Sequence, residues 1–151
     1  MDYEALLKEA DSKDLVVKEK PLRAHAGRIK GNRIAIKKDM STTEKACVLA
    51  EELGHYYTTV GNILDQSDHQ NRKQEQRARL VAYNKMVGLL GLIKAYKERC
   101  QNLSEMANCL NVSESFLKES LERYRAKYGC KVEVDNYIIL FEPQLAVMEK
   151  I

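Results

Sequence analysis

The first forty residues change from a helical to an alternating hydrophobic pattern. Tyr3, Leu6 and Leu7 recur at the spacing of one helix face, so the chain is expected to begin with a short helix. Residues 15–22 and 32–38 are instead rich in β-branched side chains that alternate with charged ones, which predicts two short strands. The intervening turn residues are Gly27, Gly31 and Asn32.

A long helix is predicted next, over about residues 41–59. It begins with Ser-Thr-Thr-Glu, from Ser41 to Glu44, a capping box in which the serine and glutamate side chains bond to the first backbone amides. Its apolar residues recur every three or four positions and predict a core-facing stripe: Ala46, Leu49, Ala50, Leu53, Tyr57 and Val60. Glu51, Glu52 and His55 fall off that stripe.

A second long helix is expected over about residues 72–99, after a polar connection at 61–70. Its later half is apolar around much of its circumference, which indicates a central buried element. The apolar residues of this helix are Ala78, Leu80, Val81, Ala82, Met86, Leu89, Leu90, Leu92 and Ile93.

The last third of the chain predicts two short helices, at about 103–109 and 113–128, with Gly129 ending the second. The alternating, β-branched residues that follow predict one C-terminal strand within 130–143.

Length and composition describe an ordinary globular chain. Its 151 residues are most simply one domain, 1–151, and the formal charge of +3 comes from interspersed acids and bases, so it does not force a nucleic-acid partner. The four cysteines form no C-x-x-C pair, and the N-terminus has no apolar signal core. No run approaches the roughly 18 apolar residues that span a membrane. These features favour a reduced, cytoplasmic protein.

The candidate site is the sequence Glu-Glu-Leu-Gly-His, from Glu51 to His55, which differs from the zinc-peptidase motif H-E-x-x-H at its first residue. Residues four apart share a helix face, so Glu51 and His55 could bind one ion while Glu52 serves as general base. Glu75, near the start of the next helix, would supply a third ligand if the two helices are antiparallel. Replacing imidazole by carboxylate shifts the preference towards harder ions such as Mn²⁺ or Mg²⁺. The alternative is a chance E-x-x-H on a solvated helix face.

Two longer segments resemble the ImmA/IrrE family of small metallo-endopeptidases. They are "EKACVLAEELGHYYTT" and "RKQEQRARLVAYNKM", the second with Glu75, Ala78 and Ala82 in an E-x-x-A-x-x-x-A pattern. The resemblance covers about residues 1–98 well and the rest loosely. It implies a minimal zincin-like α+β fold, with short N-terminal strands packed with two long helices, then a helix-turn-helix-like pair at 102–128 and a C-terminal strand at 130–143.

The resemblance also implies a function and a site. Family members antagonise helix-turn-helix repressors of phages and mobile elements, often by cleaving them. His55 and Glu75 would be metal ligands, most simply for Zn²⁺, and Glu52 the general base. Glu51 takes the place of the first histidine, which leaves zinc affinity and catalytic competence open. A catalytically silent protein that binds the repressor is therefore the alternative to a peptidase.

A helix-turn-helix DNA-binding regulator is a third hypothesis, because residues 103–121 have suitable apolar spacing. The segment that would read DNA contains Glu114, Lys118 and Glu119, and its net negative charge would repel phosphate. A packing or protein-docking role is favoured. Four residues near the motif have no assigned role: Tyr56, Tyr57 and Arg77, as possible oxyanion stabilisers, and His69, as a substitute ligand or shuttle.

Overall fold

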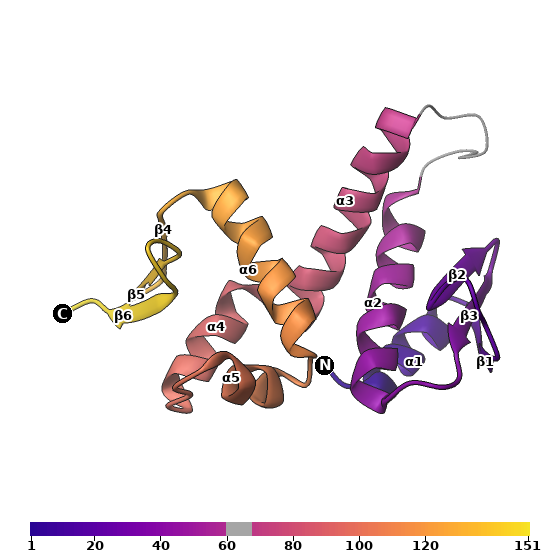
Figure 1. Cartoon of the computed structure of the whole chain (residues 1–151), viewed down its shortest axis with the longest axis horizontal. Helices are drawn as coiled ribbons and strands as arrows, with labels where there is room; N and C mark the ends of the chain where they lie inside the picture. The colour runs from indigo at the N-terminus through magenta and orange to yellow at the C-terminus, as the bar shows by residue number, and fades with distance from the viewer. Residues whose placement is uncertain (60–67) are drawn as a thin grey trace. The chain divides into compact units, whose positions relative to one another are not determined.

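The computed structural model describes residues 1–59 and 68–151 (Figure 1). Its internal contacts divide the chain into two compact units, Met1–Lys85 and Met86–Ile151. The α+β class expected from the sequence is confirmed, since helices occur with two separate three-stranded sheets. None of the helices in these described ranges is long and apolar enough to span a membrane. That all 151 residues act as one domain stays a prediction.

The first unit is built on a small mixed sheet. Strands β1 (Val16–Lys20) and β3 (Arg33–Lys37) are parallel, and β2 (Gly27–Lys30) lies antiparallel on the other side of β3. The two strands predicted from alternation are confirmed. The sequence analysis missed β2 because its four residues contain only one large apolar side chain, Ile29, and Gly27 suggested a turn.

One face of this sheet is covered by helices. Ile34 and Ile36 of β3 point into the core, where they are 2% and 0% exposed. Helix α1 (Tyr3–Ser12) buries Leu6 and Ala10, and it packs on α2 (Thr42–Thr58), which contacts both β2 and β3. The sheet therefore has one buried face and one face turned away from the helices.

Two described positions of helix α2 depart from its predicted pattern, and Val60, the last residue of the predicted stripe, lies outside the described residues. The Ser41 hydroxyl accepts from the Glu44 amide at 3.1 Å, so the predicted serine N-cap is confirmed. The Glu44 carboxylate accepts from the Ser41 hydroxyl at 3.0 Å, whereas the capping box predicted a bond to the Ser41 backbone amide. Tyr57 was predicted to lie in the core, but its ring is 40% exposed and its hydroxyl donates to Glu9 of α1. Glu52 was expected off the core-facing stripe, yet only 8% of its surface is accessible.

Helices α2 and α3 (Asp68–Met86) run antiparallel, side by side (Figure 1). Gly54 lies directly against Ala78, because a β-carbon built on Gly54 would come within 2.1 Å of the Ala78 carbonyl oxygen. Ala78 and Ala82 are fully buried. Small residues on both helices therefore allow this close packing, and it sets the spacing of the two helices that carry the candidate site.

The second long helix was predicted to be continuous, but the structure divides it into two helices. Instead of one helix at 72–99, α3 ends at Met86 and α4 (Gly88–Lys97) begins after Val87. Gly88 has φ +66°, a left-handed conformation that glycine adopts without steric cost. The apolar pattern continues through this point, so hydrophobic periodicity alone did not reveal the interruption.

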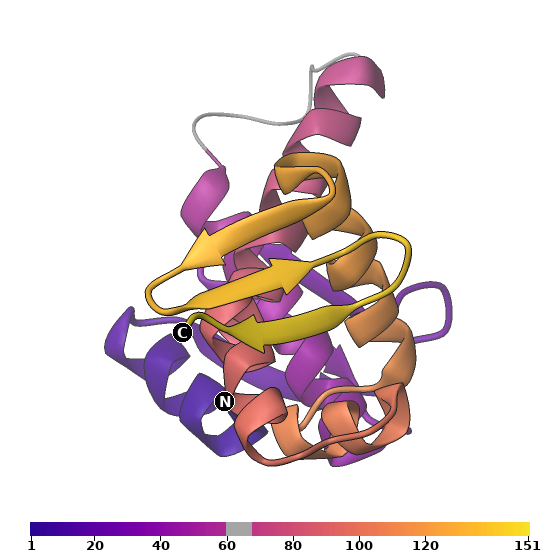
Figure 2. The same cartoon turned by 90° about the vertical axis from the view of Figure 1, so that its left-hand side faces the viewer.

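The second unit combines helices with an antiparallel sheet (Figure 2). Helices α5 (Leu103–Leu110) and α6 (Glu114–Tyr128) confirm the predicted pair, with α6 capped by Ser113 and ended at Gly129. Strand structure at the C-terminal end is confirmed, but the one strand expected within 130–143 is divided in two. Strands β4 (Lys131–Val134) and β5 (Tyr137–Leu140) form a hairpin, and β6 (Ala146–Glu149) pairs with β5. Asp135 adopts a positive φ in the hairpin turn, as turn acids readily do.

Candidate active site

His55 and Glu75 come together between α2 and α3. The Nε2 atom of His55 lies 3.1 Å from Oε2 of Glu75, although twenty positions separate them in sequence. This approach depends on Gly54, the residue before His55, because any larger side chain there would hold the helices further apart. The structure thus brings together two of the four residues singled out from the sequence.

The distance between these two atoms suits a shared ion. Ligands about 2.0–2.2 Å from a tetrahedral zinc are separated by roughly 3.3 Å. His55 and Glu75 therefore offer an imidazole nitrogen and a carboxylate oxygen at nearly the spacing that one divalent cation would require. The chemistry and the separation of this pair fit two positions of such a site.

Arg79 holds the second oxygen of Glu75. Its Nε lies 3.5 Å from Oε1, one helical turn further along α3. The contact with His55 lowers the pKa of Glu75, burial opposes this, and Arg79 adds to the lowering. The sequence analysis missed Arg79, although the spacing from Glu75 is that of an i,i+4 ion pair. His55 is thus the main cause of the lowered pKa of Glu75, and Arg79 contributes a smaller effect in the same direction.

Glu52 is a buried acid beside this pair. Burial raises its pKa to about 7, with smaller opposing and reinforcing effects from His55, Glu51 and Glu75. Gly27 of β2 makes room for it, because a β-carbon on Gly27 would lie 3.1 Å from a Glu52 carboxylate oxygen. A carboxyl group that titrates near neutral pH has the property required of a general base.

The charge of His55 is set by its neighbours. Its contact with Glu75 raises its pKa, burial opposes this, and the nearby charges of Glu75, Glu52 and Glu51 raise it further. The direction is therefore towards the protonated imidazolium when no cation is bound. Binding of a metal ion would have to displace this proton.

Glu51 is half-buried one turn before His55, and its charge raises the pKa of both Glu52 and His55. Its carboxylate is not gathered with the others into a complete donor set. Among the described side chains, those of residues 1–59 and 72–151, no three from His, Cys, Asp or Glu are grouped so as to hold a metal ion. That Glu51 serves as a third ligand stays a prediction.

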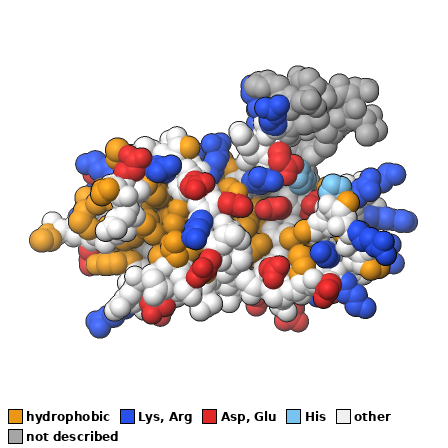
Figure 3. Space-filling view, viewed as in Figure 1, with side chains coloured by type: hydrophobic (Ala, Val, Ile, Leu, Met, Phe, Trp, Pro, Cys, Tyr) orange, Lys and Arg blue, Asp and Glu red, His pale blue; other side chains and the backbone are white. Residues whose placement is uncertain are grey.

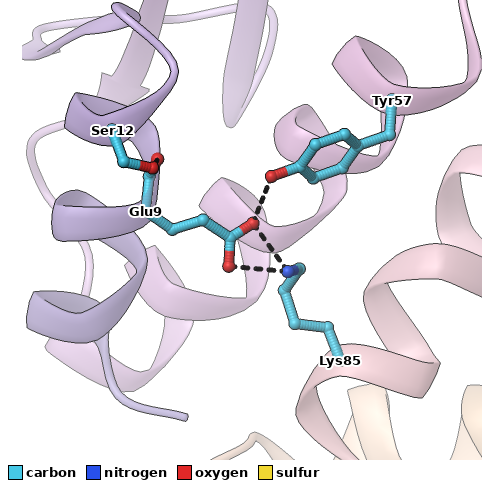
Figure 4. A network of polar contacts seen from close by, with 4 residues as sticks. All are labelled: Glu9, Ser12, Tyr57 and Lys85. Carbon is cyan, nitrogen blue, oxygen red and sulfur yellow. Dashed lines mark hydrogen bonds and ion pairs between the residues drawn. The ribbon is translucent and has the colours of Figure 1, made fainter.

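The other candidates have different surroundings. Tyr57 donates to Glu9 at 2.6 Å, and both Glu9 oxygens accept from Lys85 at 2.7 Å, so this tyrosine takes part in a network linking three helices (Figure 4). Tyr56 and Arg77 are exposed. The side chain of His69 lies outside the described residues. The oxyanion stabiliser therefore stays unassigned.

A comparison with known protein families identifies the family of this chain. A family model for M78 peptidases, described as the IrrE N-terminal-like domain, matches residues 10–127. No curated protein matches the chain. The matched range includes both α2 and α3, and hence every residue of the candidate site.

Proposed function

Because the chain belongs to the M78 family of peptidases, with an IrrE N-terminal-like domain, we propose that it is a metal-dependent endopeptidase. The observation that carries this proposal is the 3.1 Å approach of His55 and Glu75 beside the buried acid Glu52. An imidazole, a carboxylate and a carboxyl group with a pKa near neutrality form the donor and base pattern of metal-assisted hydrolysis.

Each residue would have a separate task. His55 and Glu75, with Glu51 as the third donor, would hold the cation, and zinc is the first choice because an imidazole is present. A divalent ion bound there would act as a Lewis acid towards water and a peptide carbonyl. The Glu52 carboxylate would accept a proton from the attacking water and return it to the departing amine. Arg79 would keep Glu75 oriented through its Oε1 atom.

Strand β2 supports an extended peptide as the substrate. Among the described strands it pairs with β3 alone and forms an edge of the sheet, and such an edge can accept another strand through its outer backbone groups. Gly27 of this strand lies against Glu52. A peptide that extended the sheet along β2 would therefore pass beside the proposed base.

A helix-turn-helix repressor of a phage or mobile element is the proposed protein substrate, as the family resemblance implies. The α5–α6 pair supports a protein-docking role better than DNA reading. The first turn of α6 carries Glu114, and Glu119 follows Lys118 at the next turn. Acidic residues on the helix that would enter a groove disfavour contact with phosphates.

A second candidate function is a binder that occupies the repressor without cutting it. Glu51 favours this candidate, because a third carboxylate in place of imidazole makes the site more anionic and its bound water less acidic. Among the described side chains, fewer than three metal-donor residues are grouped at one place, which also favours a protein that binds the repressor without cutting it.

Substitution Glu52→Gln distinguishes the two functions. The metal-loaded chain would be incubated with a panel of purified helix-turn-helix repressors of phages and mobile elements, and cleavage followed by mass spectrometry. A peptidase should lose at least roughly a hundredfold in cleavage rate when its general base is removed. Glu122→Gln, which changes an exposed acid on α6, is the matched control and should cleave normally.

Metal content provides an independent test. Elemental analysis of the purified chain after loading with zinc or manganese should find one ion per chain, and His55→Ala and Glu51→Ala should each lose it. Absence of bound metal under every loading condition would contradict the peptidase proposal. Repressor binding that persists in that case, and in Glu52→Gln, would establish the silent binder instead.

A further inference from the structure

The face of the N-terminal sheet turned away from the helices is strongly basic. Side chains alternate between the two faces along each strand, and the register between the strands shows which residues share the face away from the helices. We call it the basic face, and it consists of Val16, Lys18 and Lys20 of β1, Arg28 and Lys30 of β2, and Arg33, Ala35 and Lys37 of β3. Lysine and arginine side chains gather over this part of the chain in Figure 3.

No acidic side chain from the three strands neutralises this face. Glu19, the only acid in them, points to the opposite side, where it accepts from Tyr3 and Lys45. None of the six cations forms an ion pair or a side-chain hydrogen bond with a residue in the described part of the chain. The face therefore presents six positive charges available to an external anion.

The arrangement of these cations opposes sheet stability. Lys30 lies directly opposite Arg33, and Lys20 opposite Lys37. Like charges at such positions destabilise a sheet. A polyanion bound across the face would relieve this repulsion, so the bound state would gain stability from the same residues that weaken the free sheet.

We propose that the basic face binds the phosphate backbone of double-stranded nucleic acid without reading its sequence. Cations repeat at roughly 6.7 Å along β1 and β2, Arg33 and Lys37 flank Ala35 on β3, and neighbouring strands are roughly 4.8 Å apart, which gives a grid of donors rather than a single pocket. Seven of the eight residues of the face, all except Lys37, line a shallow hollow of about 460 Å³. Lysine and arginine contacts to phosphates supply this kind of affinity.

Other polyanions fit the face less well. Protein interfaces have apolar or aromatic cores depleted of charge, whereas the middle of this face is Ala35 surrounded by cations. Single strands are held by stacking on aromatic rings, and the face has none. A hollow also suits a convex phosphate ridge better than a flat bilayer.

This inference is independent of the peptidase proposal, since it uses neither the metal ligands nor Glu52. Fluorescence anisotropy of a labelled duplex of about 20 base pairs, titrated with the full chain at several salt concentrations, tests it. Wild type should bind with an affinity that falls linearly with salt on logarithmic axes. The quadruple variant Lys18→Gln, Arg28→Gln, Lys30→Gln and Arg33→Gln should bind roughly tenfold or more weakly, with a slope smaller by up to about four.

A second quadruple variant distinguishes an effect of the basic face from an effect of lowering the net charge of the chain. Lys8→Gln, Lys94→Gln, Lys118→Gln and Lys131→Gln remove the same charge from exposed positions elsewhere and should leave affinity within roughly twofold of wild type. Circular dichroism of both variants verifies their folding. Three outcomes would overturn the proposal: no salt-dependent duplex binding by wild type, equal losses in both variants, or tighter binding to polyglutamate or phosphatidylserine vesicles than to the duplex.

Discussion

Glu51 lies one helical turn before His55 and adds a third carboxylate to a site that already contains Glu52 and Glu75. Its charge raises the pKa of Glu52 and that of His55. The same position in an H-E-x-x-H motif holds a neutral imidazole, which binds zinc without adding negative charge. The identity of this one side chain therefore affects the protonation of its neighbours and, in the proposed metal site, would affect the affinity for a cation.

Substitution Glu51→His should increase zinc affinity by roughly tenfold or more, because imidazole suits this borderline ion better than a third carboxylate does. Competition with a chromogenic chelator measures the effect. The double variant Glu51→His, His55→Ala is the control and should lose the gain. Equal zinc affinity in wild type and Glu51→His would show that residue 51 does not face the ion.

Gly54 should tolerate no side chain. In Gly54→Ala the new β-carbon would meet the Ala78 backbone, which cannot rotate away, so we expect a loss of about 1–3 kcal/mol in unfolding free energy. Urea denaturation provides the measurement. Gly91→Ala in α4, whose β-carbon would lie 3.4 Å from a Leu110 methyl, is the matched control and should be neutral or stabilising. Similar values for the two variants would contradict the close approach of α2 and α3.

Residue spacing was enough to predict some of the site but not all of it. Glu75 could be paired with His55 because a polar loop between two helices predicted an antiparallel arrangement. Arg79 was missed since many charged residues surround it in sequence. The burial of Glu52 was missed because it depends on β2, whose Gly27 packs against it and whose pattern is too short to recognise.

At the scale of elements, capping and helix-ending residues predicted the boundaries correctly, whereas continuous apolar runs concealed the divisions between elements. The Ser41 N-cap of α2 and the helix end at Gly129 were predicted from residues whose hydrogen bonding or backbone conformation is specific. The interruption between α3 and α4 was hidden, because a helix pattern continues across Gly88. The β4–β5 hairpin was read as one strand since Asp135 and Asn136 occupy a turn of only two residues.

Gly88→Ala should destabilise the chain by about 1–2 kcal/mol, because the left-handed conformation is costly for residues with a β-carbon. No neighbouring atom would meet that carbon, so the effect is one of backbone conformation alone. Gly88→Asn is the matched comparison and should lose less, since asparagine adopts this conformation more readily. Thermal or urea unfolding measures both. A stabilising Gly88→Ala would instead indicate one continuous helix over 68–97.

At the scale of the whole molecule, each compact unit has its own long-range contacts. In the first unit, Glu9 of α1 joins Tyr57 of α2 and Lys85 of α3 (Figure 4). In the second, the buried Tyr124 hydroxyl of α6 accepts from the Gly88 amide at 3.1 Å. These contacts connect segments that are far apart in sequence, and no local pattern predicted them.

The Glu9 network should make stability depend on acid pH. Burial raises the pKa of Glu9, but hydrogen bonds from Lys85 and Tyr57 outweigh it and leave the pKa below its ordinary value of 4.5. The stabilisation is therefore complete above that value and is lost as pH falls through the lower folded pKa. Glu9→Gln should lose about 1–2 kcal/mol at pH 7 and show a flatter acid limb in urea denaturation. Asp11→Asn, an exposed acid on the same helix, should retain the wild-type profile.

The alternating lysines of β1 have a consequence for concentrated solutions. This strand forms one edge of its sheet, and exposed edges are where β proteins recruit further copies into fibrils. Two chains brought edge to edge along β1 would place Lys18 and Lys20 against the same residues of the other copy. At low ionic strength, electrostatic repulsion between these lysines should therefore prevent aggregation through this edge even when the protein is concentrated. High salt should screen the repulsion and weaken this protection.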